Sequence, residues 1–445
     1  MEKEKYDVIV AGGGPAGVIS AVTARKYYPD KSILLIKSVG KGVIPCGIPY
    51  MFNSLKNPED NIMGSAPLEK SRVDIMLDEV TKVSRKAKNI TTKAGKILGY
   101  DKLILAMGSN PILPPIKGLD SKNVFPIYKD MDYLKGVKEK LSAAKNIVII
   151  GGGFIGIEFA DEISGLKGKN VSLVEMFPYL LLNSFDSEFG EMVGAKLEAK
   201  GVKLLLNSKV EEILGSEVRL SDGTTIPADM VILGIGASPN TKLAEEAGLD
   251  LGKGKGIWVD EYMRTADPDV FAVGDCVGKR DFFTRKNLPV MLASTATAEA
   301  RVAGANLFKL KVVRENKGTI AIYSTCLDGL ALGSAGLTES AARGEGFEVE
   351  VGRAEVPDKH PAAMPGANKI KLKLIFSKQS GIILGGQVSG GISAGEIINI
   401  IGMAIQKRVS ATELETLQMA THPCLTAPPT MYPLVLAAQD AGDKI

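Results

Sequence analysis

The chain of 445 residues has few of the side chains that build metal centres and disulfide frameworks. It contains two histidines and four cysteines, and no two cysteines form a C-x-x-C pair. We therefore expect neither a metal site nor a disulfide-stabilised fold. Whatever chemistry occurs should use a bound organic cofactor.

Long apolar runs and an excess of charge of one sign are also missing. We find no uninterrupted run of about 18 apolar residues that could span a bilayer. No apolar segment follows the charged start, as it would in a signal peptide. The 54 basic and 51 acidic residues give a formal net charge of only +3. We expect a cytoplasmic protein that binds neither nucleic acid nor membrane.

Two stretches of the sequence share one pattern, in which a short apolar strand leads into a glycine-rich loop, a helix and a second strand. The predicted strands are residues 6–10 and 32–36 around a helix at 18–28, and residues 146–150 and 171–175 around a helix at 157–166. This pattern predicts an α/β protein with two Rossmann-like dinucleotide-binding domains.

The last third of the chain has a different pattern of apolar and polar residues. Residues 369–376 and 380–390 are typical of antiparallel strands, and residues 394–406 and 412–420 have helical spacing. We therefore expect a separate C-terminal α+β domain. The expected boundaries are 1–114 with 250–325 for the first dinucleotide domain, 115–249 for the second, and 326–445 for the C-terminal domain.

Each glycine-rich loop has the spacing G-x-G-x-x-G. The first contains Gly12, Gly14 and Gly17 and encloses Pro15 and Ala16, and the second contains Gly151, Gly153 and Gly156 and encloses Phe154 and Ile155. Glycine permits the tight turn, the close approach of backbone N–H groups to a pyrophosphate, and close packing of helix on strand. Two such loops, each between a strand and a helix, are a specific indication of nucleotide binding.

An acid is expected at the end of the second strand, where it binds the adenosine ribose. Glu175 stands 24 residues after Gly151, so the second site should prefer NADH to NADPH. The alternative is that Glu175 is a solvated charge at a strand end. In the first unit the equivalent residue is Lys37, so backbone groups or Ser38 would bind the ribose, or Lys37 would reach a phosphate.

A further strand ends in FAVGDC and places Asp275 at the edge of a sheet, where a carboxylate can bind polyol hydroxyls. The ordered set GGGPAG, LAMGSNP, GGGFIGIEFA, GIGASPNT and FAVGDC resembles the flavoprotein disulfide reductases that have two dinucleotide domains. The resemblance implies FAD on the first domain, NAD(P)H on the second, and a homodimer formed through the C-terminal domain.

The resemblance also implies contacts for individual residues. Asp275 would hold the FAD ribitol, Val80 the adenine, and Leu292 and Ala293 the flavin pyrimidine at a helix N-terminus, while Ala106, Gly108 and Gly236 belong to the matching cofactor motifs. Phe154 and Glu158 would lie beside the flavin on the nicotinamide side, and Phe154 would move aside for NADH. The alternatives are a core aromatic residue and a helix-surface acid.

Cys46, in VIPCGIPYM, is the expected redox residue. Family members with a cysteine pair carry the second cysteine where Met51 stands here, so the chain resembles the single-cysteine branch of NADH peroxidases, NADH oxidases, coenzyme A disulfide reductases and persulfide or polysulfide reductases. CGIPY is most similar to the coenzyme A disulfide and persulfide group. We expect Pro45 to help fix the loop, and the flavin and a nearby helix start to lower the thiol pKa.

Three comparisons bear on the electron acceptor, and they disagree in part. Peroxidases and water-forming oxidases of this branch carry a histidine where Pro15 stands, so the loss of that proton donor favours a sulfur substrate. Arg25 and Lys26 are similar to the basic groups that coenzyme A disulfide reductases use for coenzyme A. A solvated helix C-terminus would carry the same residues, and both interpretations stay open.

The third comparison argues the other way, because the coenzyme A enzymes tend to carry a tyrosine-bearing YAPPY-like segment near the C-terminus, where this chain has THPCLTAPP. This segment resembles the HPTxxE segment of glutathione reductase and its relatives, which delivers a histidine to the partner subunit. His422 would then be a proton donor across the dimer, or else an interface residue that caps a turn. Cys424 replaces the threonine and Ala427 the glutamate. Cys424 would be a second thiol for Cys46 of the other subunit, or a buried apolar filler.

Together these features predict an FAD-dependent oxidoreductase that passes electrons from NADH through the flavin to Cys46. The expected substrate is a persulfide, a polysulfide or coenzyme A disulfide. The alternatives are an NADH oxidase that reduces oxygen mainly to peroxide, and an electron-transfer reductase for a protein acceptor.

Overall fold

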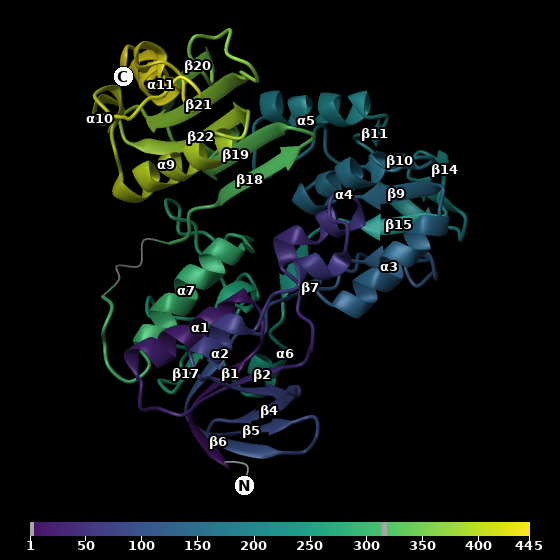
Figure 1. Ribbon diagram of the computed structural model, residues 1–445, viewed down its shortest axis with the longest axis vertical. Coiled ribbons are helices and arrows are strands. Elements are labelled where there is room, and N and C mark those ends of the chain that lie inside the picture. The colour runs from purple at the N-terminus through teal and green to yellow at the C-terminus, as the bar shows by residue number, and fades with distance from the viewer. Residues whose placement is uncertain (1–3, 314–317) are drawn as a thin grey trace.

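The computed structural model describes residues 4–313 and 318–445, and its sheets form three layered units (Figure 1). The first unit is built on a sheet of seven strands, in which the parallel core has the order β3-β2-β1-β6. Its strands are β1 (Lys5–Ala11), β2 (Ile33–Lys37), β3 (Asp74–Leu77), β4 (Val80–Ser84), β5 (Asn89–Thr92), β6 (Ile97–Leu105) and β17 (Val270–Ala272). Helices α1 (Pro15–Tyr27) and α7 (Ala293–Ala305) pack against each other, so this unit combines two distant stretches of the chain.

The second unit has a parallel sheet of five strands in the order β11-β10-β9-β15-β8. Its strands are β8 (Val124–Pro126), β9 (Asn146–Ile150), β10 (Asn170–Val174), β11 (Lys203–Leu205) and β15 (Met230–Leu233), with helices α3 (Met131–Ala143), α4 (Phe154–Ser164) and α5 (Ser187–Ala199). Strands β12 (Val210–Ile213), β13 (Glu217–Leu220) and β14 (Thr225–Pro227) form a small antiparallel sheet beside it. The two Rossmann-like units predicted from the glycine loops are thus confirmed.

An antiparallel pair of strands links the first two units. Strand β7 (Ser109–Pro111) leaves the first sheet and β16 (Ala237–Pro239) returns from the second, and the two pair with each other. Helix α6 (Lys242–Glu246) follows the return strand. The crossing therefore lies at the proline-rich stretch that follows Gly108.

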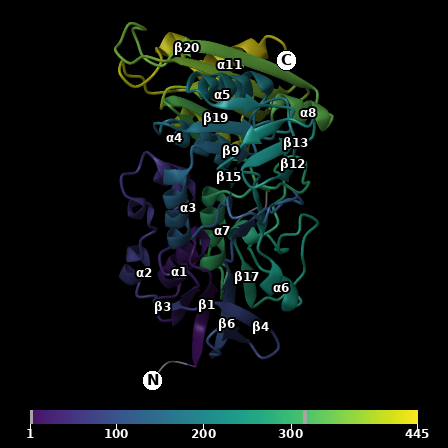
Figure 2. The same ribbon diagram turned by 90° about the vertical axis from the view of Figure 1, so that its right-hand side faces the viewer.

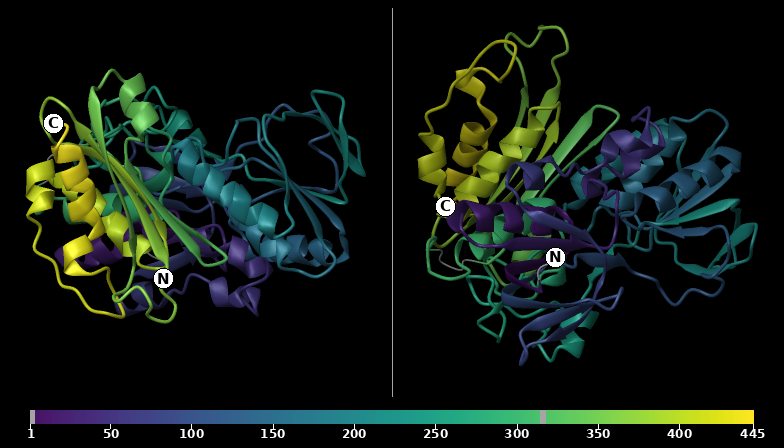
Figure 3. Two further views of the ribbon diagram at one scale, coloured as in Figure 1. Left: turned by 90° about the horizontal axis from the view of Figure 1, so that it is seen from above. Right: turned by 60° about the horizontal axis from the view of Figure 1, so that its bottom comes forward.

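The third unit is an antiparallel sheet in the order β18-β19-β22-β21-β20, which confirms the predicted α+β domain. Its elements are β18 (Ile322–Leu327), β19 (Leu330–Gly336), α8 (Glu339–Gly344), β20 (Val349–Pro357), β21 (Lys369–Ser377), β22 (Ile383–Gly390), α9 (Ala394–Lys407), α10 (Ala411–Glu415) and α11 (Pro433–Gly442). Figure 3 shows the yellow helices on one face of this green sheet and the second unit on its other side. The residue at which each domain ends stays a prediction.

Three helix predictions need correction. The helix expected at 412–420 is only α10, which ends at Glu415. The Thr416 hydroxyl bonds back to the carbonyl oxygens of Thr412 and Glu413, a contact that competes with helical hydrogen bonding. The helices of the glycine loops start earlier than expected, at Pro15 and Phe154, because the loop residues themselves form the first turn.

A buried ionic contact fastens the second unit to the third. Lys373 on β21 is only 3% exposed at its side chain, and its Nζ lies 2.9 Å from Asp186, which precedes α5, and 2.9 Å from Glu339. Gln387 donates a hydrogen bond to the same Asp186 carboxylate at 2.6 Å. Figure 2 shows α5 lying against this unit, at the end of the molecule far from the N-terminus.

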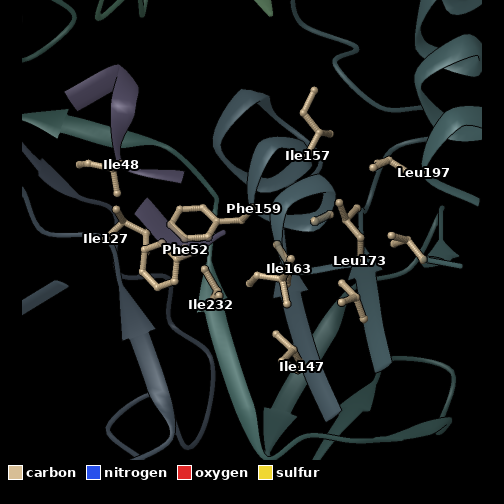
Figure 4. Packing of buried hydrophobic residues seen from close by; sticks show 14 of the residues in the cluster. Ile48, Phe52, Ile127, Ile147, Ile157, Phe159, Ile163, Leu173, Leu197 and Ile232 are labelled. Atoms are coloured by element: carbon tan, nitrogen blue, oxygen red, sulfur yellow. The ribbon is translucent and has the colours of Figure 1, made fainter. Parts of the chain in front are cut away.

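The segment that carries Cys46 packs on the second unit, although it follows the first β-α-β pattern in the sequence. Residues 43–55, here called the cysteine segment, place Phe52 against Phe159 of α4 with ring centroids 4.9 Å apart (Figure 4). Glu162, one turn further along α4, accepts hydrogen bonds of 2.7 Å from both the backbone N–H and the hydroxyl of Ser54. Helix α4 therefore fixes the position of the cysteine segment.

We predict that Glu162→Ala lowers the free energy of unfolding by about 1–3 kcal/mol, because it leaves the Ser54 donors without an acceptor. Thermal unfolding of the cofactor-loaded protein, followed by circular dichroism, measures the effect. The control is Glu198→Ala on the exposed face of α5, which should change stability by less than about 0.5 kcal/mol. Equal midpoints for the two variants would show that Glu162 does not hold the segment.

Candidate active site

Both glycine loops open into one continuous cavity of about 2080 Å³. An ordinary small-molecule pocket measures about 300–1,000 Å³, so this space suits two large ligands better than one. The first and second units and strand β18 of the third all contribute to its walls. The nucleotide sites and the thiol are therefore parts of a single site.

The first glycine loop is shaped to receive a pyrophosphate. A Cβ at Gly12 would lie 2.1 Å from the Ala106 carbonyl oxygen, and one at Gly17 would lie 1.9 Å from that of Gly12, so neither position tolerates a side chain. Gly14 caps α1 without a side-chain hydrogen bond and faces open space. Pro15 and Ala16 line the cavity, and the free N–H groups of the first helical turn suit an anion.

Other predicted contacts of the first unit also line this cavity: Lys37, Ser38, Val80, Ala106, Gly108, Asp275, Leu292 and Ala293. Leu292 caps α7 without a side-chain hydrogen bond, so a second helix N-terminus opens into the space. The Lys37 ammonium donates to the Gly40 carbonyl at 2.9 Å, and the Lys37 side chain covers Gly13. These groups fit a dinucleotide such as FAD.

Two polar residues beside Asp275 were not found from the sequence. Ser109 donates to the Asp275 carboxylate at 2.9 Å, and the Lys129 ammonium lies 3.1 Å from the same oxygen and 2.9 Å from the Ser109 hydroxyl. Ser109 follows Gly108 directly, so the motif LAMGSNP already placed this part of the chain near the cofactor site. Lys129 lies outside every motif and reaches the site only through the fold.

The second glycine loop repeats the geometry of the first. A Cβ at Gly156 would lie 1.8 Å from the Gly151 carbonyl oxygen, so Gly156 sits behind the loop, as Gly17 does. Gly153 caps α4 without a side-chain bond and faces open space. Gly151, Gly153, Phe154, Ile155 and Gly236 line the cavity. A second dinucleotide therefore fits here.

Glu175 lies at the rim of this second loop and is only 8% exposed. Its carboxylate accepts hydrogen bonds from the backbone N–H groups of Gly152 at 2.6 Å and Phe177 at 2.9 Å. The alternative of a solvated strand-end charge is therefore wrong. A carboxylate has about four acceptor sites, so a ribose hydroxyl can still bind.

Phe154, the first residue of α4, stacks on Tyr323 of β18 with ring centroids 5.0 Å apart and an interplanar angle of 25°. Both rings line the cavity. Burial raises the pKa of Tyr323 to about 12, so its hydroxyl stays protonated at neutral pH. Tyr323 was not found from the sequence, because it belongs to the third unit and lies far from Phe154 along the chain.

The Cys46 thiol is exposed and opens onto the cavity from a short 3-10 helix, η1 (Pro45–Gly47). Desolvation by the surrounding walls, followed by the negative charge of Glu158, raises its pKa, and Lys129 acts in the opposite direction. The nearby helix start therefore does not lower this pKa as expected, and the effect of the flavin stays a prediction. A helix of three residues carries too small a dipole to do so.

Glu158 also lines the cavity and is only partly exposed, so the helix-surface alternative is wrong. Burial raises its pKa to about 7, the carboxylates of Asp161 and Glu162 add to the effect, and a hydrogen bond from Thr325 works against it. The Thr325 hydroxyl donates to Glu158 Oε1 at 2.8 Å. Thr325 comes from β18 and, like Tyr323, had no sequence motif.

The structure does not bring Arg25 or Lys26 to the cavity, contrary to their expected contact with substrate. The Arg25 guanidinium donates to four backbone carbonyls of the surrounding loops, those of Pro29, Lys31, Ser71 and Arg72. Lys26 is exposed and lies over the ring of Tyr27. Both residues serve the end of α1, as the structural alternative predicted.

His422 and Cys424 lie in an exposed loop outside the cavity of their own chain. The backbone N–H of Cys424 donates to His422 Nδ1 at 3.2 Å, so the neutral ring carries its proton on Nε2. Cys424 is exposed, which contradicts the alternative of a buried filler. His360, which was not singled out from the sequence, joins the same loop through Thr426 at 2.9 Å.

Two dinucleotide loops facing one cavity define a NAD(P)H-dependent flavin oxidoreductase. The chain belongs to the pyridine nucleotide-disulphide oxidoreductase family, whose model matches residues 6–300, and the dimerisation domain of that family matches residues 322–432. No helix of the described residues is long and apolar enough to cross a membrane.

Relatives of two kinds are similar to the whole chain. An NADH oxidase of Methanocaldococcus jannaschii is 33% identical over 98% of this chain and 99% of its own length. An NAD(P)H coenzyme A polysulfide/persulfide reductase of Pyrococcus horikoshii is 32% identical over 87% of this chain and 88% of its own. The solved structure of an NAD-dependent persulfide reductase from A. fulgidus has a TM-score of 0.91 at 30% identity, over 98% of this chain and 83% of that chain.

We predict that Glu175→Gln lowers the ratio of kcat/KM for NADH to that for NADPH by on the order of tenfold, about 1.4 kcal/mol, because it removes the charge that repels a 2′-phosphate. Steady-state kinetics with both nucleotides measures the ratio. Glu211→Gln, an exposed acid on the same cavity wall, is the control and should leave it unchanged. An unaltered ratio in Glu175→Gln would contradict the assignment.

Proposed function

We propose that this protein uses NADH to reduce a persulfide, a polysulfide or coenzyme A disulfide at Cys46. The observation that carries the proposal is the exposed Cys46 thiol. It is the only cysteine among the described residues that line the cavity, and no histidine stands beside it there. A lone accessible thiol suits attack on a sulfur–sulfur bond.

The missing histidine argues against reduction of oxygen or peroxide to water. That chemistry needs a proton donor at the reacting oxygen, and the first glycine loop offers Pro15, which has no proton to give. Bound FAD would supply the chemistry that accepts hydride from NADH and returns the electron pair to the sulfur at Cys46. The protein's part is to bind both dinucleotides, to hold Cys46 at the cavity wall and to present Phe154 where the nicotinamide would enter.

The names of the relatives support this proposal in part. The Pyrococcus horikoshii and A. fulgidus proteins are named as persulfide reductases, and the latter as NAD-dependent. The Methanocaldococcus jannaschii relative is named NADH oxidase, which supports a second candidate that reduces oxygen to peroxide. An oxidase of that kind needs the two dinucleotides and not Cys46.

We further propose that the protein works as a homodimer in which the partner's C-terminal loop completes the site. The matching dimerisation domain and the exposed loop of His422 and Cys424 support this arrangement. His422 would then be available as a proton donor to the other subunit. Backbone carbonyls engage Arg25, so of the two basic residues at the end of α1 only Lys26 would be available to coenzyme A.

We predict that Cys46→Ser lowers anaerobic NADH-dependent persulfide reduction by at least about 100-fold, because serine is a far weaker nucleophile toward sulfur. NADH oxidation by oxygen should persist in this variant. Cys326→Ser, an exposed thiol outside the cavity, is the control and should keep full persulfide reduction. Unchanged persulfide turnover in Cys46→Ser would contradict the proposal and favour the NADH oxidase as the function.

A further inference from the structure

We propose that the buried ion pair of Lys279 and Glu299 positions the groups that would hold FAD, above all the carboxylate of Asp275. Neither side chain of the pair lines the cavity, so both act through the backbone that they hold. The inference goes beyond the proposed reduction of sulfur, because it concerns the flavin site alone and holds whichever acceptor the protein uses.

Both side chains of the pair are almost completely buried, that of Lys279 being 4% exposed and that of Glu299 6%. The Lys279 ammonium lies 3.1 Å from the Glu299 carboxylate and donates to the carbonyl oxygens of Gly274 at 2.7 Å and Val277 at 3.1 Å. Its three N–H donors therefore all have acceptors. The Glu299 carboxylate in turn accepts a hydrogen bond of 2.9 Å from the backbone N–H of Gly274.

These contacts enclose the short 3-10 turn η4 (Gly274–Cys276), which comes shortly after β17. Gly274 has a φ of +78°, and a Cβ there would lie 2.9 Å from the Cβ of Ala16 on α1. The turn thus lies against α1 on one side and is tied to α7 through Glu299 on the other. The middle residue of the turn is Asp275, which lines the cavity. The ion pair therefore determines where the Asp275 carboxylate stands.

The same pair also holds the other wall of the flavin site. Glu299 belongs to α7, whose N-terminus opens into the cavity. The backbone carbonyl of Lys279 accepts a hydrogen bond of 3.1 Å from the N–H of Leu288, and residues 288–292, which lead into α7, all line the cavity. The pair therefore sets the spacing between Asp275 and the start of α7. FAD would meet the first group at its ribityl chain and the second at its pyrimidine ring.

Stability alone does not explain a pair that is buried this deeply. Taking two charges out of water costs free energy, and apolar residues of similar volume at such positions are often as stable as the pair or more stable. Apolar side chains cannot, however, bind the N–H and C=O groups of one turn at the same time. The fixed geometry of the turn is therefore the better explanation of the pair.

We predict that the double variant Lys279→Met/Glu299→Gln releases FAD from the holoenzyme faster, by on the order of tenfold, because a displaced Asp275 loses a hydrogen bond to the cofactor. The two charges are removed together, so neither is left buried without its partner. The new amide can still accept from Gly274, but the turn loses the ammonium that held its carbonyls. The amount of free FAD that passes an ultrafiltration membrane over time measures the release.

The control is Lys102→Met/Asp269→Asn, which removes another ion pair of the first unit. The Lys102 ammonium donates to Asp269 at 2.6 Å, and Asp269 directly precedes β17, whereas Gly274 lies beyond the other end of that strand. Neither control residue lines the cavity, so this variant should release FAD at the wild-type rate. Wild-type release from Lys279→Met/Glu299→Gln, or equally fast release from both double variants, would overturn the inference.

The midpoint potential of the bound flavin is a readout that a purely structural role would not move. The N-terminus of α7 would stabilise negative charge on the reduced flavin, so its displacement in Lys279→Met/Glu299→Gln should make the potential more negative. Anaerobic titration of the holoenzyme against a reference dye, without substrate, measures the potential independently of the proposed function. A wild-type potential in this variant would overturn the inference.

Lys279→Arg tests the position of the turn in a variant that keeps both charges. The planar guanidinium cannot place its N–H groups where the compact ammonium does, so the turn has to move. FAD release should then be at least about threefold faster, and this variant decides the question where the double variant yields too little folded protein. Wild-type release from folded Lys279→Arg would contradict the assignment.

Discussion

The packing of the cysteine segment on helix α4 is the constraint on which the rest of the site depends. Phe52 and Phe159 form the apolar part of this contact, and Glu162 forms the polar part through Ser54. The segment comes from the first unit in the sequence, but the second unit fixes its position. One helix therefore starts at the nucleotide loop, carries Glu158 into the cavity and holds Cys46 in place. Binding of a nucleotide at the start of α4 and reaction at the thiol share this single support.

The electrostatics of the cavity follow from the same arrangement. Helix α4 brings carboxylates close to Cys46, so the protein alone disfavours the thiolate and also keeps Glu158 from ionising at acid pH. Lys129, held by Asp275 and Ser109, is the opposing positive charge. Without a bound cofactor the protein groups therefore favour the protonated thiol.

Local sequence patterns were enough to predict the parts of the site that are built from consecutive residues. Both glycine loops, Asp275 and the start of α7 at Leu292 lie where their motifs placed them. Tyr323 and Thr325 were not predictable, because β18 reaches the cavity only when the third unit docks beside α4. Arg25 wrongly suggested a substrate site, because a positive charge is favoured at a helix C-terminus as well as beside a phosphate. The apolar spacing predicted a longer helix than the one that ends before Thr416. The hydroxyl of Thr416 bonds to the backbone, and hydrophobic periodicity cannot reveal such a contact.

The proposed reaction requires that Cys46 receive sulfur from the substrate. It is tested most directly by mass spectrometry of the FAD-loaded protein after anaerobic incubation with one equivalent of an alkyl persulfide and no NADH. We expect one added sulfur atom on the peptide that contains Cys46, and this atom should disappear when NADH is supplied. An unmodified Cys46, or sulfur found only on Cys326 or Cys424, would contradict it.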